Sequence, residues 1–113
     1  MANTFKQATK SSLVTDAVTS TNTNILLAGA SSTVIILNAL VANKTSTSAN
    51  VDVYLVPNSG DNVYLLKSVP VPAGSSLELI TGSKIILEAS DVIRARCDTA
   101  TAMDITLSYL DQT

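Results

Sequence analysis

The chain has 113 residues, a net charge of −2 and a pI near 4.7, and hydrophobic residues make up 46% of it against 14% charged residues. This length fits one domain, and a mean hydropathy of +0.33 is high for a small soluble monomer, which indicates that part of the surface meets another protein. No cluster of Lys or Arg suggests a nucleic-acid partner, and no apolar run is long enough to span a membrane. The opening MANTFKQATKSS lacks the apolar core of a secretory signal, so we expect synthesis in the cytoplasm.

Almost every ordered stretch favours strand over helix, because Val, Ile, Thr and Leu recur at period two between Ser, Thr, Asn and Gly. The sequence predicts an all-β protein, an antiparallel β-sandwich of the jelly-roll or Greek-key type with eight or nine short strands. We expect residues 1–24 to form an N-terminal arm or the first strands, and residues 25–113 to form the β-sandwich domain. In chain order the expected strands are 4–10, 13–19, 23–28, 33–43, 50–56, 62–69, 75–80, 85–87 with 91–97, and 103–111.

The run VIILNALV at 34–41 does not alternate between apolar and polar residues, unlike the strand at 103–111. Such a run is typical of a strand covered on both faces, by the second sheet on one side and by a neighbouring subunit or a loop on the other. We therefore predict a subunit or lattice contact at Val34, Ile36 and Leu40. If Ile36 faces a neighbour, Ile36→Asp should change assembly more than folding.

Turn signals separate the strands: PNSGD at 57–61, PAGS at 72–75, TGS at 81–83 and ASD at 89–91. The first of these should join two strands as a hairpin. A predicted hairpin at 34–56, with its loop at 44–49, echoes another at 92–110, with its loop at 98–102. This weak repeat suggests two pseudo-symmetric halves, with chance similarity in a Thr- and Ser-rich chain as the alternative.

Little in the sequence points to catalysis. The chain has no His and one Cys, which excludes His/Cys metal sets and Ser-His-Asp or Cys-His nucleophile arrangements. The carboxylates are scattered, although sequence alone leaves a glycosidase-like pair open. We expect no enzyme activity, no catalytic residue, no metal and no cofactor. Cys97 alternates with Ile93 and Ala95, which favours a small buried hydrophobe over a reactive or crosslinking thiol.

A few polar residues remain as candidates for binding. Arg94 and Arg96 lie on the face opposite Cys97, where they would either pair with acidic groups of a neighbouring chain or be solvated, and we include both among the interface candidates. Asp91 should bond to the backbone of its own turn. The triplet 43–45 matches a glycosylation acceptor, but we interpret it as a loop.

Three segments resemble small virion structural proteins of tailed bacteriophages: VPAGSSLELI at 71–80, KIILEASDVI at 84–93 and MDITLSYL at 103–110. The likeness extends upstream through 34–56 and covers most of the chain. In such proteins a pattern of strand, PAG, strand, LEAGD, strand recurs, and Ser90 stands where that pattern has Gly. The resemblance implies a place in the virion after assembly in the host cytoplasm, with the major capsid protein or other virion proteins as partners.

The resulting expectation is a non-enzymatic virion structural protein, a capsid decoration or cement protein that stabilises the head lattice as a homo-oligomer. One alternative is a neck, tail or fibre-base accessory protein. Another, from a different class, is a surface- or glycan-binding module that uses the loops at 44–49 and 98–102. The scarcity of aromatic residues argues against this module, because sugar faces are held by aromatic stacking.

Overall fold

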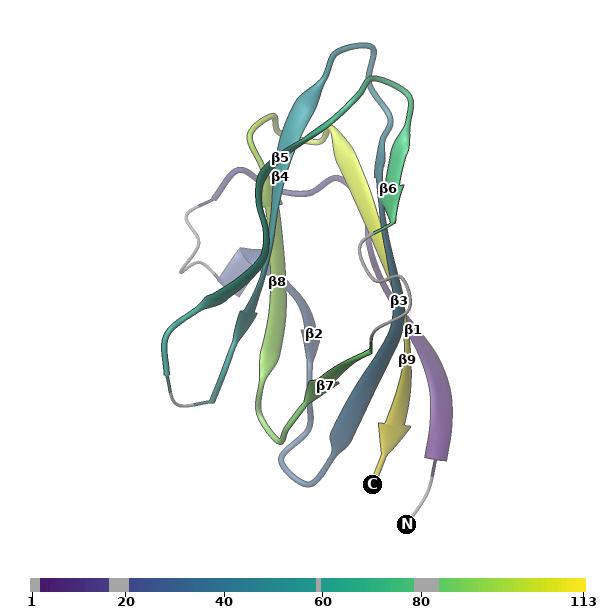
Figure 1. Cartoon of the computed structure of the whole chain (residues 1–113), viewed down its shortest axis with the longest axis vertical. Coiled ribbons are helices and arrows are strands. Elements are labelled where there is room, and N and C mark those ends of the chain that lie inside the picture. Colours follow the sequence, from purple (N-terminus) through teal and green to yellow (C-terminus); the bar gives the residue numbers. More distant parts are fainter. Residues whose placement is uncertain (1–2, 17–20, 59, 79–83) are drawn as a thin grey trace.

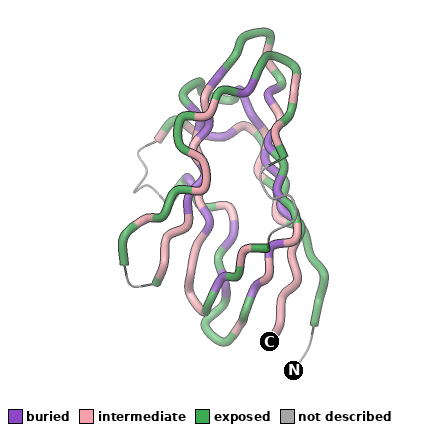
Figure 2. The backbone as a smooth tube through the Cα atoms, in the orientation of Figure 1, coloured by how far each residue is buried: buried purple, intermediate pink, exposed green. Residues whose placement is uncertain are grey.

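The computed structural model describes residues 3–16, 21–58, 60–78 and 84–113 and consists of two antiparallel sheets packed face to face (Figure 1). The buried residues line the space between the sheets (Figure 2). This arrangement confirms the predicted all-β sandwich. A short 3-10 helix, η1 (Thr21–Thr23), precedes the second strand. The strands are β1 (Asn3–Lys10), β2 (Asn24–Leu27), β3 (Thr33–Asn43), β4 (Ala49–Val56), β5 (Val63–Val71), β6 (Ser76–Glu78), β7 (Ile85–Leu87), β8 (Val92–Cys97) and β9 (Met103–Gln112).

The strand order is that of a jelly roll. Sheet A has the order β1-β9-β3-β6, with β7 also paired to β3, and sheet B has the order β2-β8-β4-β5. Because β6 and β7 pair with successive parts of β3, they act as one interrupted edge strand. With β6 and β7 counted as one strand, the chain has eight strands among the described residues. β1 pairs with β9, β2 with β8, β3 with β6 and β7, and β4 with β5. This nested pairing is the jelly-roll pattern.

The segments 34–56 and 92–110 do not form the expected hairpins, because each of them crosses from one sheet to the other. β3 lies in sheet A and β4 in sheet B, and β8 lies in sheet B and β9 in sheet A. Within the sheets, β3 pairs with β9 and β4 with β8, so the two similar units lie antiparallel and side by side. Only the hairpin expected at 57–61 is a true one, since β4 and β5 pair antiparallel within sheet B.

β3 alternates once a β-bulge is taken into account. Its register with β9 shifts between Ile36 and Asn38, so Leu37 is an extra residue that changes the phase of the alternation. Val34 and Ile36 point inward and belong to the core, while Leu40 points outward and keeps 39% of its surface exposed. The prediction that Val34 and Ile36 line a subunit contact is therefore wrong, because both side chains are buried inside their own chain.

The first strand is part of sheet A rather than a free arm. All eight residues of β1 pair with β9, from Asn3 opposite Gln112 to Lys10 opposite Ile105. Residues 13–16, expected to begin a strand, run instead as an irregular segment from sheet A to sheet B. Leu13 is buried on this path, and its amide donates to the Met103 carbonyl at 2.7 Å. Residues 17–19 of that expected strand, and the expected turn at 81–83 with residues 79–80 before it, lie outside the described residues.

The turn before β8 has a backbone conformation at position 90 that favours glycine. Ser90 has a φ of 68°, in the left-handed region that favours glycine, which is the residue of the phage pattern at this place. The turn closes through the Asp91 amide, which donates to the Glu88 carbonyl at 3.1 Å. The Asp91 carboxylate accepts from the Glu88 amide at 3.0 Å, so the predicted local bond of Asp91 to its own turn is confirmed.

Candidate functional site

A row of apolar side chains crosses the outer face of sheet A. Directly paired residues of antiparallel strands share a face, and Phe5 pairs with Leu110, Leu110 with Ile35, and Ile35 with Ile86. Ile35 lies between two core residues of β3, which places this row on the side away from the core. Phe5 is 76% exposed and Ile86 is 58% exposed. We call these four residues the apolar row; it extends from β1 at one edge of the sheet to β7 at the other.

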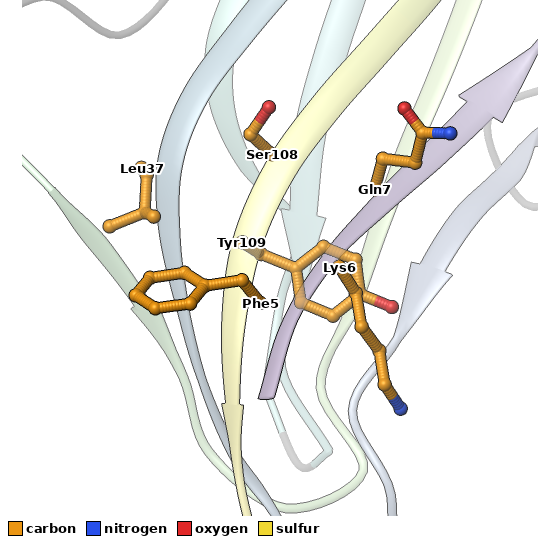
Figure 3. A pocket seen from close by; sticks show the side chains of 6 residues that line it. All are labelled: Phe5, Lys6, Gln7, Leu37, Ser108 and Tyr109. Atoms are coloured by element: carbon orange, nitrogen blue, oxygen red, sulfur yellow. The ribbon is translucent and has the colours of Figure 1, made fainter. Parts of the chain in front are cut away.

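A shallow groove of about 410 Å³ lies beside the row, over β1, β9 and β3. Its lining includes Phe5 and Leu37, and the Phe5 ring lies across β9 and points toward Leu37 (Figure 3). The bulge that displaces Leu37 thus adds a further apolar side chain to this face. The other lining residues are Lys6, Gln7, Ser108 and Tyr109.

The three long strands of sheet A are also almost free of charge on their outer face, although Glu78 of the edge strand β6 pairs with Leu40 on this face. Over β1, β9 and β3, all of which lie within the described residues, Asp104 is the single charged side chain that points outward. It lies at the end of β9, where the Lys44 ammonium contacts it at 2.8 Å. Protein surfaces normally carry interspersed charges, and the centre of an interface is where charges are depleted. The outward residues are Asn3, Phe5, Gln7, Thr9, Thr33, Ile35, Asn38, Leu40, Ala42, Asp104, Thr106, Ser108, Leu110 and Gln112.

The outer face of sheet B, by contrast, carries charges that bond within the chain. The Arg96 guanidinium donates to the Asp52 carboxylate at 2.8 Å, to the Asp16 carbonyl at 2.7 Å and to the Thr15 carbonyl at 3.1 Å. The last two carbonyls belong to the segment that crosses over from β1. Arg96 therefore fastens this crossing segment to β8 and β4.

The second predicted arginine and a buried tyrosine lie in one row across sheet B. Arg94 pairs with Asn24 and with Tyr54, and its Nε donates to the Asn24 side-chain oxygen at 2.7 Å. The Tyr54 hydroxyl donates to the hydroxyl of Thr23 in η1 at 3.1 Å. Burial raises the pKa of Tyr54, and the bond to Thr23 opposes that effect. Arg94 and Arg96 thus have structural roles within the chain, and a contact of either with another chain stays a prediction.

The two loops expected for a glycan-binding module meet at one end of the sandwich. The Lys44 amide donates to the Ala102 carbonyl at 2.9 Å, and the Asn50 amide donates to the Asp98 carboxylate at 3.0 Å. Neither loop contains an aromatic ring for a sugar to stack on. Asn43 is buried, and its side-chain amide donates to the carbonyls of Thr47 and Val71, so it shapes the first loop as predicted and is not presented as a glycan acceptor.

A second, polar groove and the single cysteine lie apart from the two outer faces. A second groove of about 280 Å³ lies by Pro57, Asn58 and the turn at 88–91, where Asp91 also accepts from the Asn58 amide at 2.9 Å. Across the described part of the chain, no three residues of the His, Cys, Asp and Glu types gather closely enough to hold a metal ion. Cys97 is buried as predicted, and this burial raises the pKa of its thiol.

Neither a protein-family model nor a curated protein nor a solved structure matches this chain. Among the described residues, no helix has the length and apolar character needed to cross a membrane. Jelly rolls serve many functions, so the surface of this chain indicates its function better than the fold does. Of the predicted interface residues, only Leu40 lies on the outer face of sheet A. Sequence reasoning identified β3 but missed Phe5, Ile35, Leu37, Ile86 and Leu110 on that same face.

Proposed function

We propose that this protein is a non-enzymatic structural protein of a tailed-phage virion, a decoration or cement protein that binds the head lattice through the outer face of sheet A. The observation that carries the proposal is the apolar row, on a sheet face whose three long strands carry an outward charge only at Asp104, which pairs with Lys44. A protein partner is the occupant that such a face favours, because a row of apolar side chains across four strands fits a broad apolar contact, and the outward residues of β1, β9 and β3 include no cation for a phosphate. The resemblance of the segments at 71–80, 84–93 and 103–110 to phage virion proteins supplies the biological setting.

Simple energetics support a contact of this kind. Covering an exposed Phe or Ile side chain contributes up to about 2 kcal/mol, so Phe5 and Ile86 alone would supply a substantial part of a weak contact. A decoration protein is present in many copies, and a lattice of weak contacts stabilises the particle through their number. The charges of sheet B, already bonded within the chain, would stay exposed to solvent.

A matched pair of substitutions tests the role of the surface. Ile86→Asp, on sheet A, should lower co-sedimentation with particles of the phage that encodes this chain at least about tenfold, because a carboxylate in an apolar contact costs more than 1.4 kcal/mol. Leu27→Asp is the control, since Leu27 is 61% exposed on sheet B, close to the 58% of Ile86. Equal binding by the two folded variants would contradict the use of sheet A.

The copy number separates the decoration function from the alternative at the neck, tail or fibre base. Quantitative mass spectrometry of purified particles should give a copy number comparable to that of the major capsid protein. A far smaller number would favour the accessory position. Absence of the protein from particles would overturn the virion assignment altogether.

A further inference from the structure

The edge strand β1 differs from the other edges of the two sheets. Edges normally carry devices that prevent pairing with other chains, such as short length, proline, bulges or charge. In sheet B, β2 has four residues and a register shift, and β5 contains Pro70 and two register shifts. In sheet A, β6 and β7 have three residues each. The β1 edge has eight residues in one unbroken register, without proline or bulge.

β1 carries two lysines, which are a usual protection of an edge strand, but the charge of one of them is compensated. Lys6 contacts Asp111 of the neighbouring β9 at 3.3 Å, so its charge is compensated within its own sheet. Lys6 and Lys10 both share the inward face of sheet A with Ala8, while the outward residues are uncharged. Phe5 lies on this outward face, and it is the most exposed large hydrophobic residue of the described chain.

We propose that β1 pairs antiparallel with β1 of a second copy, with Phe5 opposite Phe5 of that copy. The two A sheets would then form one continuous sheet around a two-fold axis that passes between the Phe5 residues. This inference deepens the proposed function, on which its biological meaning rests, by naming a second copy as the partner of the edge. The outer faces of both copies would lie on the same side and remain open to the lattice.

The apolar row and the charge of Lys6 together determine the register of the two β1 strands. Phe5 opposite Phe5 makes the two apolar rows collinear, and it places an aromatic pair directly across the strands, which is a favourable combination. Lys6 then faces Thr4 of the second copy. A register centred on Lys6 would oppose two like charges, and one centred on Gln7 would place Phe5 against Thr9 and break the continuity of the row.

Cysteine cross-linking tests both the pairing and its register. In the proposed register Asn3 lies opposite Gln7 of the second copy, at a Cα separation that suits a disulfide. An equimolar mixture of Asn3→Cys and Gln7→Cys chains should form a disulfide-linked heterodimer under mild oxidation, and neither variant alone should do so. The native thiol does not interfere, because Cys97 is buried. Cross-linking of Gln7→Cys alone, or no cross-link in the mixture, would overturn the proposal.

Sedimentation velocity over a range of concentrations provides the independent readout. The pairing involves a short edge, so a weak dimer is expected, with dissociation in the micromolar range. Phe5→Asp should be monomeric where Leu27→Asp still dimerises, and a wild-type chain that stays monomeric throughout would contradict the inference. A monomer that still binds particles would leave the proposed function intact, whereas a dimer that is absent from particles would refute only that function.

Discussion

The two outer faces of this sandwich use their polar residues in opposite ways. On sheet B, Arg96 bonds to Asp52 and to two carbonyls of the crossing segment, and η1 covers Tyr54. On sheet A, the three long strands present the apolar row and, apart from Asp104, uncharged side chains, with Phe5 76% exposed. The chain thus closes the outer face of sheet B with its own segments through directional polar bonds. The other face carries the composition of an interface without having a partner inside the chain.

The largest effect should separate two adjacent residues of β3. Ile36→Asp should lower the free energy of unfolding by more than about 4 kcal/mol and abolish folding, because it places a charge in the core. Ile35→Asp should cost only about 1 kcal/mol, the scale of strand propensity, because Ile35 lies on the outer face. Urea denaturation of both variants checks the difference.

The same pair also tests which face binds. Folded Ile35→Asp should lose particle binding, since the substitution places a charge in the middle of the apolar row. If Ile36→Asp kept its fold but lost assembly, Ile36 would face a neighbouring subunit, as the sequence alone predicted. That result would contradict the assignment of the inner and outer faces.

A smaller change in the free energy of unfolding is expected on the outer face of sheet B. Arg96→Lys should lower the free energy of unfolding by about 2 kcal/mol, because an ammonium cannot reproduce the three directed bonds of the guanidinium. Particle binding at saturating concentration should not change in the folded variant. Thermal and urea unfolding measure the first quantity and co-sedimentation the second. Loss of binding without loss of stability would show that sheet B contacts the partner.

The smallest effect concerns Asp104, the one outward charge of β1, β9 and β3. The hydrogen bond from Lys44, followed by that from the Ser12 amide, lowers the pKa of Asp104 below its ordinary value of 3.8. The bonds of this carboxylate therefore stabilise the fold above its ordinary pKa, and this contribution is lost as the pH falls through the lower, folded-state pKa.

Asp104→Asn should accordingly be less stable than the wild type at neutral pH by less than about 1 kcal/mol, the scale of an exposed ion pair. The difference should vanish under strongly acidic conditions. Free energies of unfolding measured in urea over a pH series check this. A difference that persists at the same size when the carboxylate is protonated would contradict the assigned role of Asp104.

The fold was largely accessible from sequence because strand periodicity is a local property. The range 33–43 coincides with β3, and the alternation at 103–111 matches β9. The ranges 85–87 and 91–97, expected together, are the separate strands β7 of sheet A and β8 of sheet B. The pairing of the strands could not be predicted from the sequence in the same way. Whether β3 turns back within its own sheet or crosses to the other depends on partners distant in the chain, and similar loops serve both connections.

In the candidate site, the direction of the side chains of β3 also depends on a strand distant in the sequence. The mostly apolar run at 34–41 predicted a strand covered on both faces, and the structure shows cover on the inner face. The bulge at Leu37 decides which residues face outward, and a bulge depends on the register with β9. Phe5, Leu110 and Ile86 were missed because each alone is an ordinary exposed apolar residue. The signal that was available is the lack of charge at alternate positions of β1, β3 and β9.

Hydroxyl-radical footprinting of the free and particle-bound protein tests the central claim most directly, because it reports the accessibility of individual side chains without substitutions. Phe5 and Ile86 should be oxidised several-fold more slowly on the particle, and Leu27 and Val63 of sheet B, which are also exposed in the free chain, should react at unchanged rates. Protection confined to Leu27 and Val63, with Phe5 and Ile86 as reactive as before, would contradict the assignment of the contact to sheet A.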